Sequence, residues 1–217
     1  MVQGELDMSK DKDTSRGIAT NSSVISLFPT NIMKFKLWGE YPHWEDLLND
    51  LVVTEETEPT ILEGPGRTSF IEDWHQRSFL LERYPELESI VNACCSNYCY
   101  THSLEHIELD DSWYTIMNKG SKIQRHRHEG SVLSGTIFVN VPEDTYGLAF
   151  ANPTIPHRMM ERQNATHEST TYAHLEQVET GDVLIYPSWM EHFVPKIECD
   201  YRATISFNTA YPAWRKL

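Results

Sequence analysis

From about residue 106 onward, apolar and polar residues alternate in short runs that recur at nearly regular intervals. Such alternation is the pattern of a strand that buries one face. Turn-forming pairs such as Glu129-Gly130 and Thr180-Gly181 separate several of the runs. Roughly eight short strands separated by such turns predict a double-sheet jelly roll or barrel rather than a parallel βαβ fold. The predicted strands lie within residues 106–118, 122–128, 132–141, 146–153, 172–179, 182–187, 191–195 and 202–211.

The N-terminal half differs, because its apolar residues are spaced three and four apart. This spacing predicts helices over residues 43–52, 69–84 and 85–100, the last of which begins with a proline and an acidic first turn. Residues 24–37 are β-like and interrupted by Pro29, which favours an edge position. We therefore predict a mainly β fold with N-terminal helices packed on one side.

These differences in the pattern of apolar and polar residues divide the chain into three segments. Residues 1–23 are charged, rich in Ser and Thr and without period, which predicts a disordered tail. Residues 24–105 form an N-terminal strand and supporting helices, and residues 106–217 form the β core. We expect the last two segments to make one globular domain, since 217 residues suit a single domain.

Composition narrows the class of protein. With 40% hydrophobic residues the chain can build a sizeable core. The net charge of −14 disfavours nucleic acid and anionic membranes as partners, because both select basic surfaces. No run approaches the roughly 20 apolar residues of a membrane span, and the polar N-terminus lacks a signal-peptide core. We expect a soluble cytoplasmic protein whose four cysteines are reduced thiols.

Three histidines are candidate metal ligands. His126 and His128 stand in "KIQRHRH", where residues two apart share a strand face, and His192 stands alone among apolar residues in "SWMEHFVP". A jelly roll brings such distant strands together, and imidazole suits iron, zinc, copper and nickel. A lone HxH pair also occurs on exposed strands, so the prediction depends on His192, whose isolation in an apolar run calls for a partner.

An arginine that follows these histidines in the chain is a further candidate site residue. Arg202 stands ten residues after His192, at the head of the β-like run "RATISFN". It either bonds Asp200 or reaches solvent, or it lies deeper in the barrel, where its planar fork suits bidentate capture of a carboxylate. Thr204 lies on the same face two residues on and would add a hydroxyl to such a site.

The segments "HRHEGSVLSGTIFVNVP", "GDVLIYPSWMEHFVP" and "RATISFN" resemble the Fe(II)- and 2-oxoglutarate-dependent oxygenases. The most similar group has an HxHxxSxxSG signature and occurs in bacteria and marine phages. The resemblance covers roughly residues 113–211 and implies a double-stranded β-helix that holds one Fe(II). The resemblance implies that His126 and His192 are metal ligands and that Arg202 binds the distal carboxylate of 2-oxoglutarate. His128 stands where the superfamily usually has Asp or Glu.

The resemblance also implies further site residues. Asn118 matches a position at which relatives often bond the cosubstrate, and inward-facing Ser134 and Thr136 are weaker candidates. Glu129 would point to the face opposite His128 and is a poor substitute for the usual carboxylate. A third neutral imidazole leaves the site one unit more positive than the usual triad.

The function implied is a dioxygenase that uses Fe(II), 2-oxoglutarate and O2. Its catalytic residues are His126, His128 and His192, and it hydroxylates a small molecule or protein with release of succinate and CO2. Residues 154–170 form a long polar loop that would act as a lid.

Two alternatives remain open. The first is a cupin, because "GSKIQRHRH" fits G-x5-H-x-H, although the glutamate expected after this motif is missing and Trp189 replaces a glycine of the second motif. A cupin oxygenase or isomerase would not need 2-oxoglutarate, and Arg202 would lose its role. The second is a binding protein without catalysis, in which neighbouring side chains satisfy the histidines.

Overall fold

A computed structural model describes residues 29–37, 39–53, 61–70, 78–143, 145–154 and 173–213. All of the helices and strands below belong to one compact unit, Asn31–Leu217. The expected tail, residues 1–23, lies outside the described residues, as does nearly all of the predicted 154–170 loop. No helix in the described part of the chain is long and apolar enough to cross a membrane.

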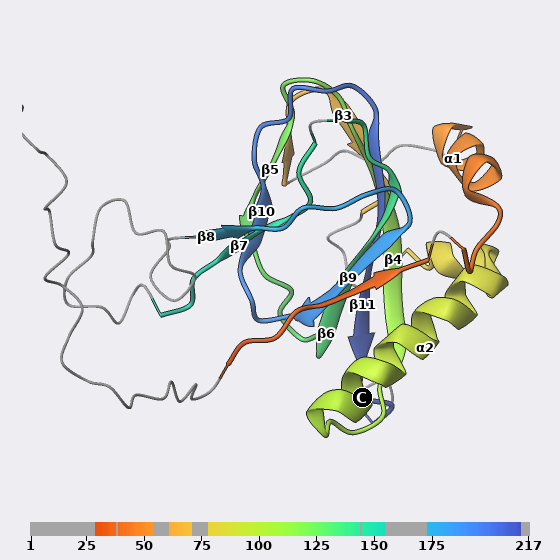
Figure 1. Cartoon of the computed structure of the whole chain (residues 1–217), viewed down its shortest axis with the longest axis vertical. Coiled ribbons are helices and arrows are strands. Elements are labelled where there is room, and N and C mark those ends of the chain that lie inside the picture. Colours follow the sequence, from red (N-terminus) through yellow and green to blue (C-terminus); the bar gives the residue numbers. More distant parts are fainter. Residues whose placement is uncertain are drawn as a thin grey trace, which may run out of the picture. The chain divides into compact units, whose positions relative to one another are not determined.

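The larger of two sheets has six antiparallel strands (Figure 1). Its longest strands lie in the centre, where both faces of the sheet are buried. Successive side chains along each of these strands point to opposite faces, so odd and even residues pack against different layers. In spatial order the strands are β1 (Met33–Lys36), β9 (Asp182–Pro187), β6 (Leu133–Asn140), β11 (Arg202–Ala210), β4 (Glu108–Met117) and β3 (Gly66–Thr68).

The second sheet has five shorter strands and packs face to face with the first. Side chains from both sheets fill the space between them, among them Phe138 and Tyr186 from the first sheet and Phe150 and Val194 from the second. This arrangement confirms the predicted double-stranded β-helix. In spatial order the strands are β2 (Leu62–Glu63), β5 (Lys122–His126), β10 (His192–Val194), β7 (Ala149–Ala151) and β8 (Ala173–Leu175).

Helices cover the outer face of the six-stranded sheet, as predicted (Figure 1). α1 (Trp44–Val53) and α2 (Pro85–His102) match the predictions for residues 43–52 and 85–100. The sequence of α2 explains its bounds. Pro85 occupies the first turn, whereas Ser103 ends the helix in the left-handed conformation with φ of 54°. The apolar faces of α1 and α2 form a second core with the outward-facing residues of β4, β6, β9 and β11.

The helix predicted over residues 69–84 is wrong where the structure describes it. Only a 3-10 turn, η2 (Leu80–Arg83), forms there, and residues 71–77 are not described. Phe79 forms a β-bridge to Ser112, and the Ser112 hydroxyl accepts a hydrogen bond from the Leu81 amide. Contacts with β4 therefore override the local helical spacing, as tertiary contacts often do for short segments.

Candidate metal centre

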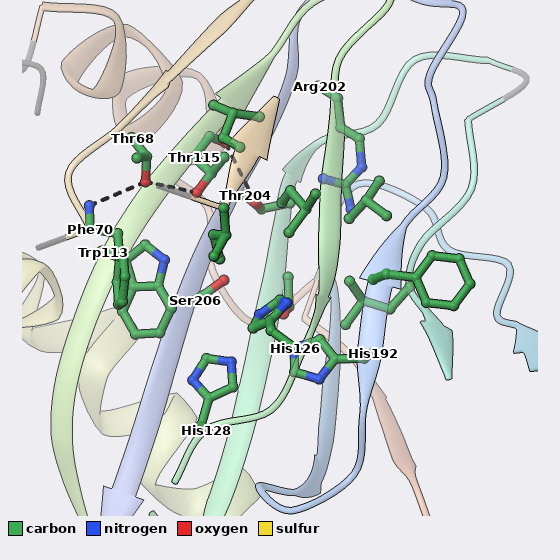
Figure 2. Close-up of a pocket in the computed structure, with 17 residues that line it drawn as sticks. Thr68, Phe70, Trp113, Thr115, His126, His128, His192, Arg202, Thr204 and Ser206 are labelled. Atoms are coloured by element: carbon green, nitrogen blue, oxygen red, sulfur yellow. Dashed lines mark hydrogen bonds between the residues drawn. The ribbon is translucent and has the colours of Figure 1, made fainter. Parts of the chain in front are cut away.

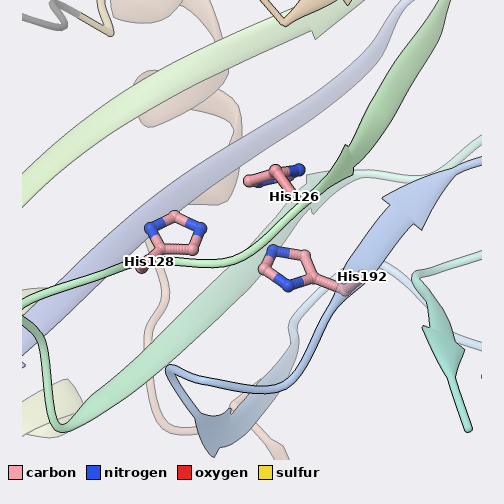
Figure 3. Close-up of side chains that lie close together, drawn as sticks. All are labelled: His126, His128 and His192. Carbon is pink, nitrogen blue, oxygen red and sulfur yellow. The ribbon is translucent and has the colours of Figure 1, made fainter. Parts of the chain in front are cut away.

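Three histidine side chains converge at one end of the space between the sheets (Figure 3). Each offers a ring nitrogen, and these nitrogens all lie within 4.8 Å of one another. His126 ends β5 and His192 begins β10, where the two residues are direct partners across the strand pair. Their ring centroids are 4.3 Å apart. Residues 66 positions apart in the chain thus face the same point because β5 and β10 are neighbours.

His128 belongs to the cluster, but not because it shares a strand face with His126, as the sequence predicted. β5 ends at His126, so strand alternation does not place His128. Its backbone N–H donates to the carbonyl of Ser188, over 3.0 Å, and its ring stacks on His192 with an interplanar angle of 9°. The Trp113 ring stacks on it as well, at 21°. Contacts with three other segments therefore hold this histidine in place.

The hydrogen bonds of His126 and His192 determine which nitrogen faces the centre. The Nδ1 atom of His126 lies 2.8 Å from the Gln124 carbonyl oxygen, and Nδ1 of His192 lies 3.0 Å from that of Met190. A carbonyl only accepts, so each Nδ1 carries the proton and each Nε2 keeps its lone pair. Carbonyl bonds of this kind orient histidine ligands in metal sites. Both rings are therefore arranged to bind a metal through Nε2.

The Nε2 atom of His128 is buried, and none of the described residues hydrogen-bonds it. Leaving a buried polar atom unpaired costs about 1–3 kcal/mol, so such atoms in native proteins call for an explanation. A metal ion between the three rings would supply the missing partner. The three nitrogens therefore fit a divalent metal that prefers imidazole.

Burial keeps the three rings neutral. It lowers the pKa of His126 and lowers that of His192 to about 3. The pKa of His128 falls well below its ordinary value, because of burial and then the positive charges that its two neighbours would carry. At neutral pH each lone pair is thus available without loss of a ring proton. No carboxylate among the described residues joins this cluster, and Glu129 is exposed and paired with Arg127, 2.6 Å away.

A cavity extends from the histidines between the sheets (Figure 2). One part of its wall is polar and carries hydroxyls, whereas other parts are aliphatic and aromatic. Beside the three histidines and Arg202, the lining residues are Ile61, Leu62, Thr68, Phe70, Trp113, Thr115, Ile123, Thr136, Leu148, Phe193, Val194, Thr204 and Ser206.

Arg202 lies at the other end of this cavity and is the largest fully buried side chain (Figure 2). Its guanidinium donates to the Gly147 carbonyl over 3.2 Å and lies over the Phe138 ring, 5.4 Å from the centroid. Its Nε lacks a hydrogen-bond partner among the described residues, and none of their carboxylates pairs with it. Burial lowers the pKa of Arg202 to about 10. A buried, unneutralised cation of this kind calls for an anionic partner.

The remaining predicted residues have different positions. Thr204 lines the cavity, and its hydroxyl donates to the Thr115 carbonyl over 3.4 Å. Thr136 also lines it. Asn118 does not, since its side-chain oxygen accepts the Tyr201 amide over 3.2 Å, in the connection that leads into β11. The residue directly follows the end of β4, so strand alternation no longer fixes its direction.

Sequence reasoning missed two aromatic neighbours of the histidines. The Tyr186 hydroxyl lies 3.2 Å from Nε2 of His192, and Trp113 stacks on His128 as described above. Alternation along β9 and β4 places both residues on the inner face, but only strand pairing brings them to this end of the cavity.

Comparisons with known proteins point to one family. Residues 111–208 match the model of a family described as "Putative 2OG-Fe(II) oxygenase", in which 2OG is 2-oxoglutarate. No curated protein matches the sequence. The matched segment begins within β4 and ends within β11, so it contains all three histidines and Arg202.

Solved structures share the fold at low sequence identity. A 2OG-Fe(II) oxygenase family oxidoreductase from Burkholderia pseudomallei is 13% identical, with a TM-score of 0.54 over 82% of this chain and 85% of that one. HygX from Streptomyces hygroscopicus, with nickel and 2-oxoglutarate bound, is 11% identical, with a TM-score of 0.55 over 84% of each chain. A Trichoplax adhaerens prolyl hydroxylase, in complex with a hypoxia-inducible factor peptide, is 12% identical, with a TM-score of 0.56 over 85% and 86%.

Proposed function

Because residues 111–208 match the family model of the 2OG-Fe(II) oxygenases, we propose that the chain belongs to this family and hydroxylates its substrate with release of succinate and CO2. One observation carries this proposal. The cavity that contains three inward-facing histidine nitrogens also contains, at its other end, a buried arginine without a carboxylate partner among the described residues. A metal ion and a dicarboxylate would satisfy both ends together.

His126, His128 and His192 would hold Fe(II) through their Nε2 atoms. The bound iron would supply the activation of O2 and the oxidation that the side chains themselves cannot carry out. Three neutral imidazoles leave the full charge of the ion uncompensated, whereas a carboxylate ligand would cancel one unit of it. The anionic cosubstrate would supply the missing negative charge, so we expect metal and 2-oxoglutarate to strengthen each other's binding.

Arg202 would bind the distal carboxylate of 2-oxoglutarate. Its free donors are fixed by burial and by the contacts with Gly147 and Phe138, so binding requires little reorganisation. The hydroxyl of Thr204, two residues along β11 on the same face, would turn from the Thr115 carbonyl to donate a hydrogen bond to this carboxylate. A wall of low polarity would strengthen this charge pair, and the bound cosubstrate would extend from Arg202 toward the histidines at the other end of the cavity.

The aromatic part of the wall would face the substrate. Trp113 and Phe70 contact each other, with ring centroids 4.9 Å apart, and Trp113 also contacts His128. These rings would exclude water from the part of the cavity next to the histidines. The substrate would be a small molecule or a protein, since the charge of −14 disfavours nucleic acid. We place the enzyme in the cytoplasm, where its four free thiols stay reduced.

An anaerobic titration tests this function without knowledge of the substrate. Adding Fe(II) and then 2-oxoglutarate to the metal-free protein should produce a weak visible charge-transfer band. Admission of O2 should then form succinate slowly, through uncoupled turnover. The Arg202→Met variant should bind Fe(II) but give no band, whereas Arg125→Met, at an exposed ion pair with Glu191, should behave as wild type. Metal binding without a band in the wild type would favour a cupin, and absence of metal binding would favour a binding protein.

A further inference from the structure

The inner face of β11 carries a row of polar side chains that runs along the cavity (Figure 2). Arg202, Thr204 and Ser206 are two residues apart, so they point to the same side of the strand, and all three line the cavity. Strand pairing places Ser206 opposite Trp113 of β4, whose ring stacks on His128. The row therefore leads from the arginine end of the cavity to the histidine end.

Ser206 differs from its neighbours in this row because its hydroxyl has no partner in the part of the chain that the structure describes. The Thr204 hydroxyl donates to the Thr115 carbonyl over 3.4 Å. Asn208, the next residue on this face, accepts the Ser134 hydroxyl over 2.7 Å. Ser206 is half-buried and faces the cavity, so the partner of its hydroxyl is whatever occupies the cavity.

The cavity wall offers Ser206 no anionic acceptor. The lining residues include no Asp or Glu, and the residues next to Ser206 on the adjacent strands are Trp113 on β4 and Thr136 on β6. A serine hydroxyl has one proton to donate, and its strongest hydrogen bonds are those to ionised acceptors. An acidic ligand that reaches the histidine end of the cavity would therefore be the best partner available to this hydroxyl.

The spacing along β11 suits a dicarboxylate that extends from Arg202 toward the histidines. Two residues of a strand advance about 7 Å, which is close to the distance between the carboxylates of an extended five-carbon dicarboxylate. With one carboxylate at Arg202 and Thr204, the other end of such a ligand would lie at the level of Ser206. A carboxylate oxygen has more than one lone pair, so it can bind a metal ion and still accept a hydrogen bond.

We propose that Ser206 is a cosubstrate-binding residue that donates a hydrogen bond to the metal-side carboxylate of 2-oxoglutarate. This inference rests on the proposed function for the identity of the ligand. Because no carboxylate of the described residues joins the three histidines, the cosubstrate would bring the anion nearest to the ion, and the hydroxyl would fix how that anion is oriented. Thr204 and Ser206 thus serve opposite ends of one ligand.

A pair of acids separates the two ends. 2-Oxopentanoate has the same five-carbon chain and the same metal-side group as 2-oxoglutarate but lacks the distal carboxylate, so it should bind more weakly. Dissociation constants are measured without O2 on Fe(II)-loaded protein, from the visible charge-transfer band. Ser206→Ala should weaken both acids by a similar factor of about 5–20, because the hydrogen bond to their common end is lost. Thr204→Val, the matched loss of a hydroxyl on the same face, should weaken 2-oxoglutarate only.

Two further measurements complete the test. Ser206→Ala should bind Ni(II) as tightly as the wild type, and Ser206→Thr, which keeps a hydroxyl, should bind both acids more tightly than Ser206→Ala. A wild type that takes up Fe(II) but binds neither acid overturns the proposed function and this inference with it. A wild type that binds both acids, together with unchanged affinities in Ser206→Ala, overturns the role of Ser206 alone. Weaker binding of 2-oxoglutarate only in Ser206→Ala would place the hydroxyl at the distal carboxylate and would also overturn that role.

Discussion

Replacing the buried arginine should make the metal-loaded protein more stable without 2-oxoglutarate and less stable with it. Burial lowers the pKa of Arg202 from 12.5 to about 10. Each tenfold change in proton affinity corresponds to about 1.4 kcal/mol, so the folded state holds this cation at a cost of about 3 kcal/mol. Because the side chain stays protonated in both states at pH 7, the cost does not vary with pH in that range. Arg202→Met removes the charge and keeps a long, flexible side chain.

Part of this gain is offset by interactions that the variant loses. The hydrogen bond to the Gly147 carbonyl and the contact with the Phe138 ring are each worth about 1 kcal/mol. We therefore expect Arg202→Met to raise the free energy of unfolding by about 1 kcal/mol. The wild type should gain about 2.7 kcal/mol from 2-oxoglutarate at 100 times its dissociation constant, whereas the variant should gain nothing. The order of stabilities is expected to reverse.

Urea denaturation measures both effects in protein loaded with Ni(II), which avoids turnover. Four transitions are compared, for wild type and Arg202→Met, each with and without 2-oxoglutarate. Arg125→Met serves as the matched control because its ion pair with Glu191 is partly exposed and worth no more than about 1 kcal/mol. The control should retain the whole stabilisation by 2-oxoglutarate.

Two results would refute this reasoning. A loss of more than about 1 kcal/mol in Arg202→Met without 2-oxoglutarate would mean that the guanidinium is satisfied by the fold itself. Stabilisation of Arg202→Met by 2-oxoglutarate to the wild-type extent would place the distal carboxylate elsewhere in the cavity.

Three further predictions concern the fold and the metal centre. Gly135→Ala should cost about 1–3 kcal/mol in urea denaturation, because the new methyl group would overlap the buried Phe207 ring, whereas Gly39→Ala has open space and should be neutral. Tyr186→Phe should tighten Ni(II) binding up to about fivefold, since the metal no longer displaces the hydroxyl from Nε2 of His192; weaker binding would contradict this. The free energy of unfolding of the metal-free protein should fall by at least about 1 kcal/mol when the pH is lowered from 7.5 to 5.5. The reason is that His192, with its pKa lowered to about 3, takes up a proton in this range only when the protein unfolds. In urea denaturation at the two pH values, the His192→Gln variant should show a smaller decrease.

The sequence alone predicted most of the strands and the main parts of the site. Each of the eight predicted strands within residues 106–211 contains one of the strands β4 to β11, because alternation records which face of its own strand a side chain occupies. Gly130 and Gly181, in the predicted turns, have positive φ, as turn chemistry requires. The spacing of His126, His192 and Arg202 and the family signature indicated the metal and the cosubstrate.

Only the tertiary structure decided which strands are neighbours and where they end. A local pattern contains no information about pairing partners, since a strand can bury the same face against many others. The pairing of β5 with β10 brings His126 to His192, and the pairing of β6 with β11 brings Ser134 to Asn208. The early end of β5 leaves His128 without a local carbonyl bond, so its orientation depends on residues that lie far from it in the chain.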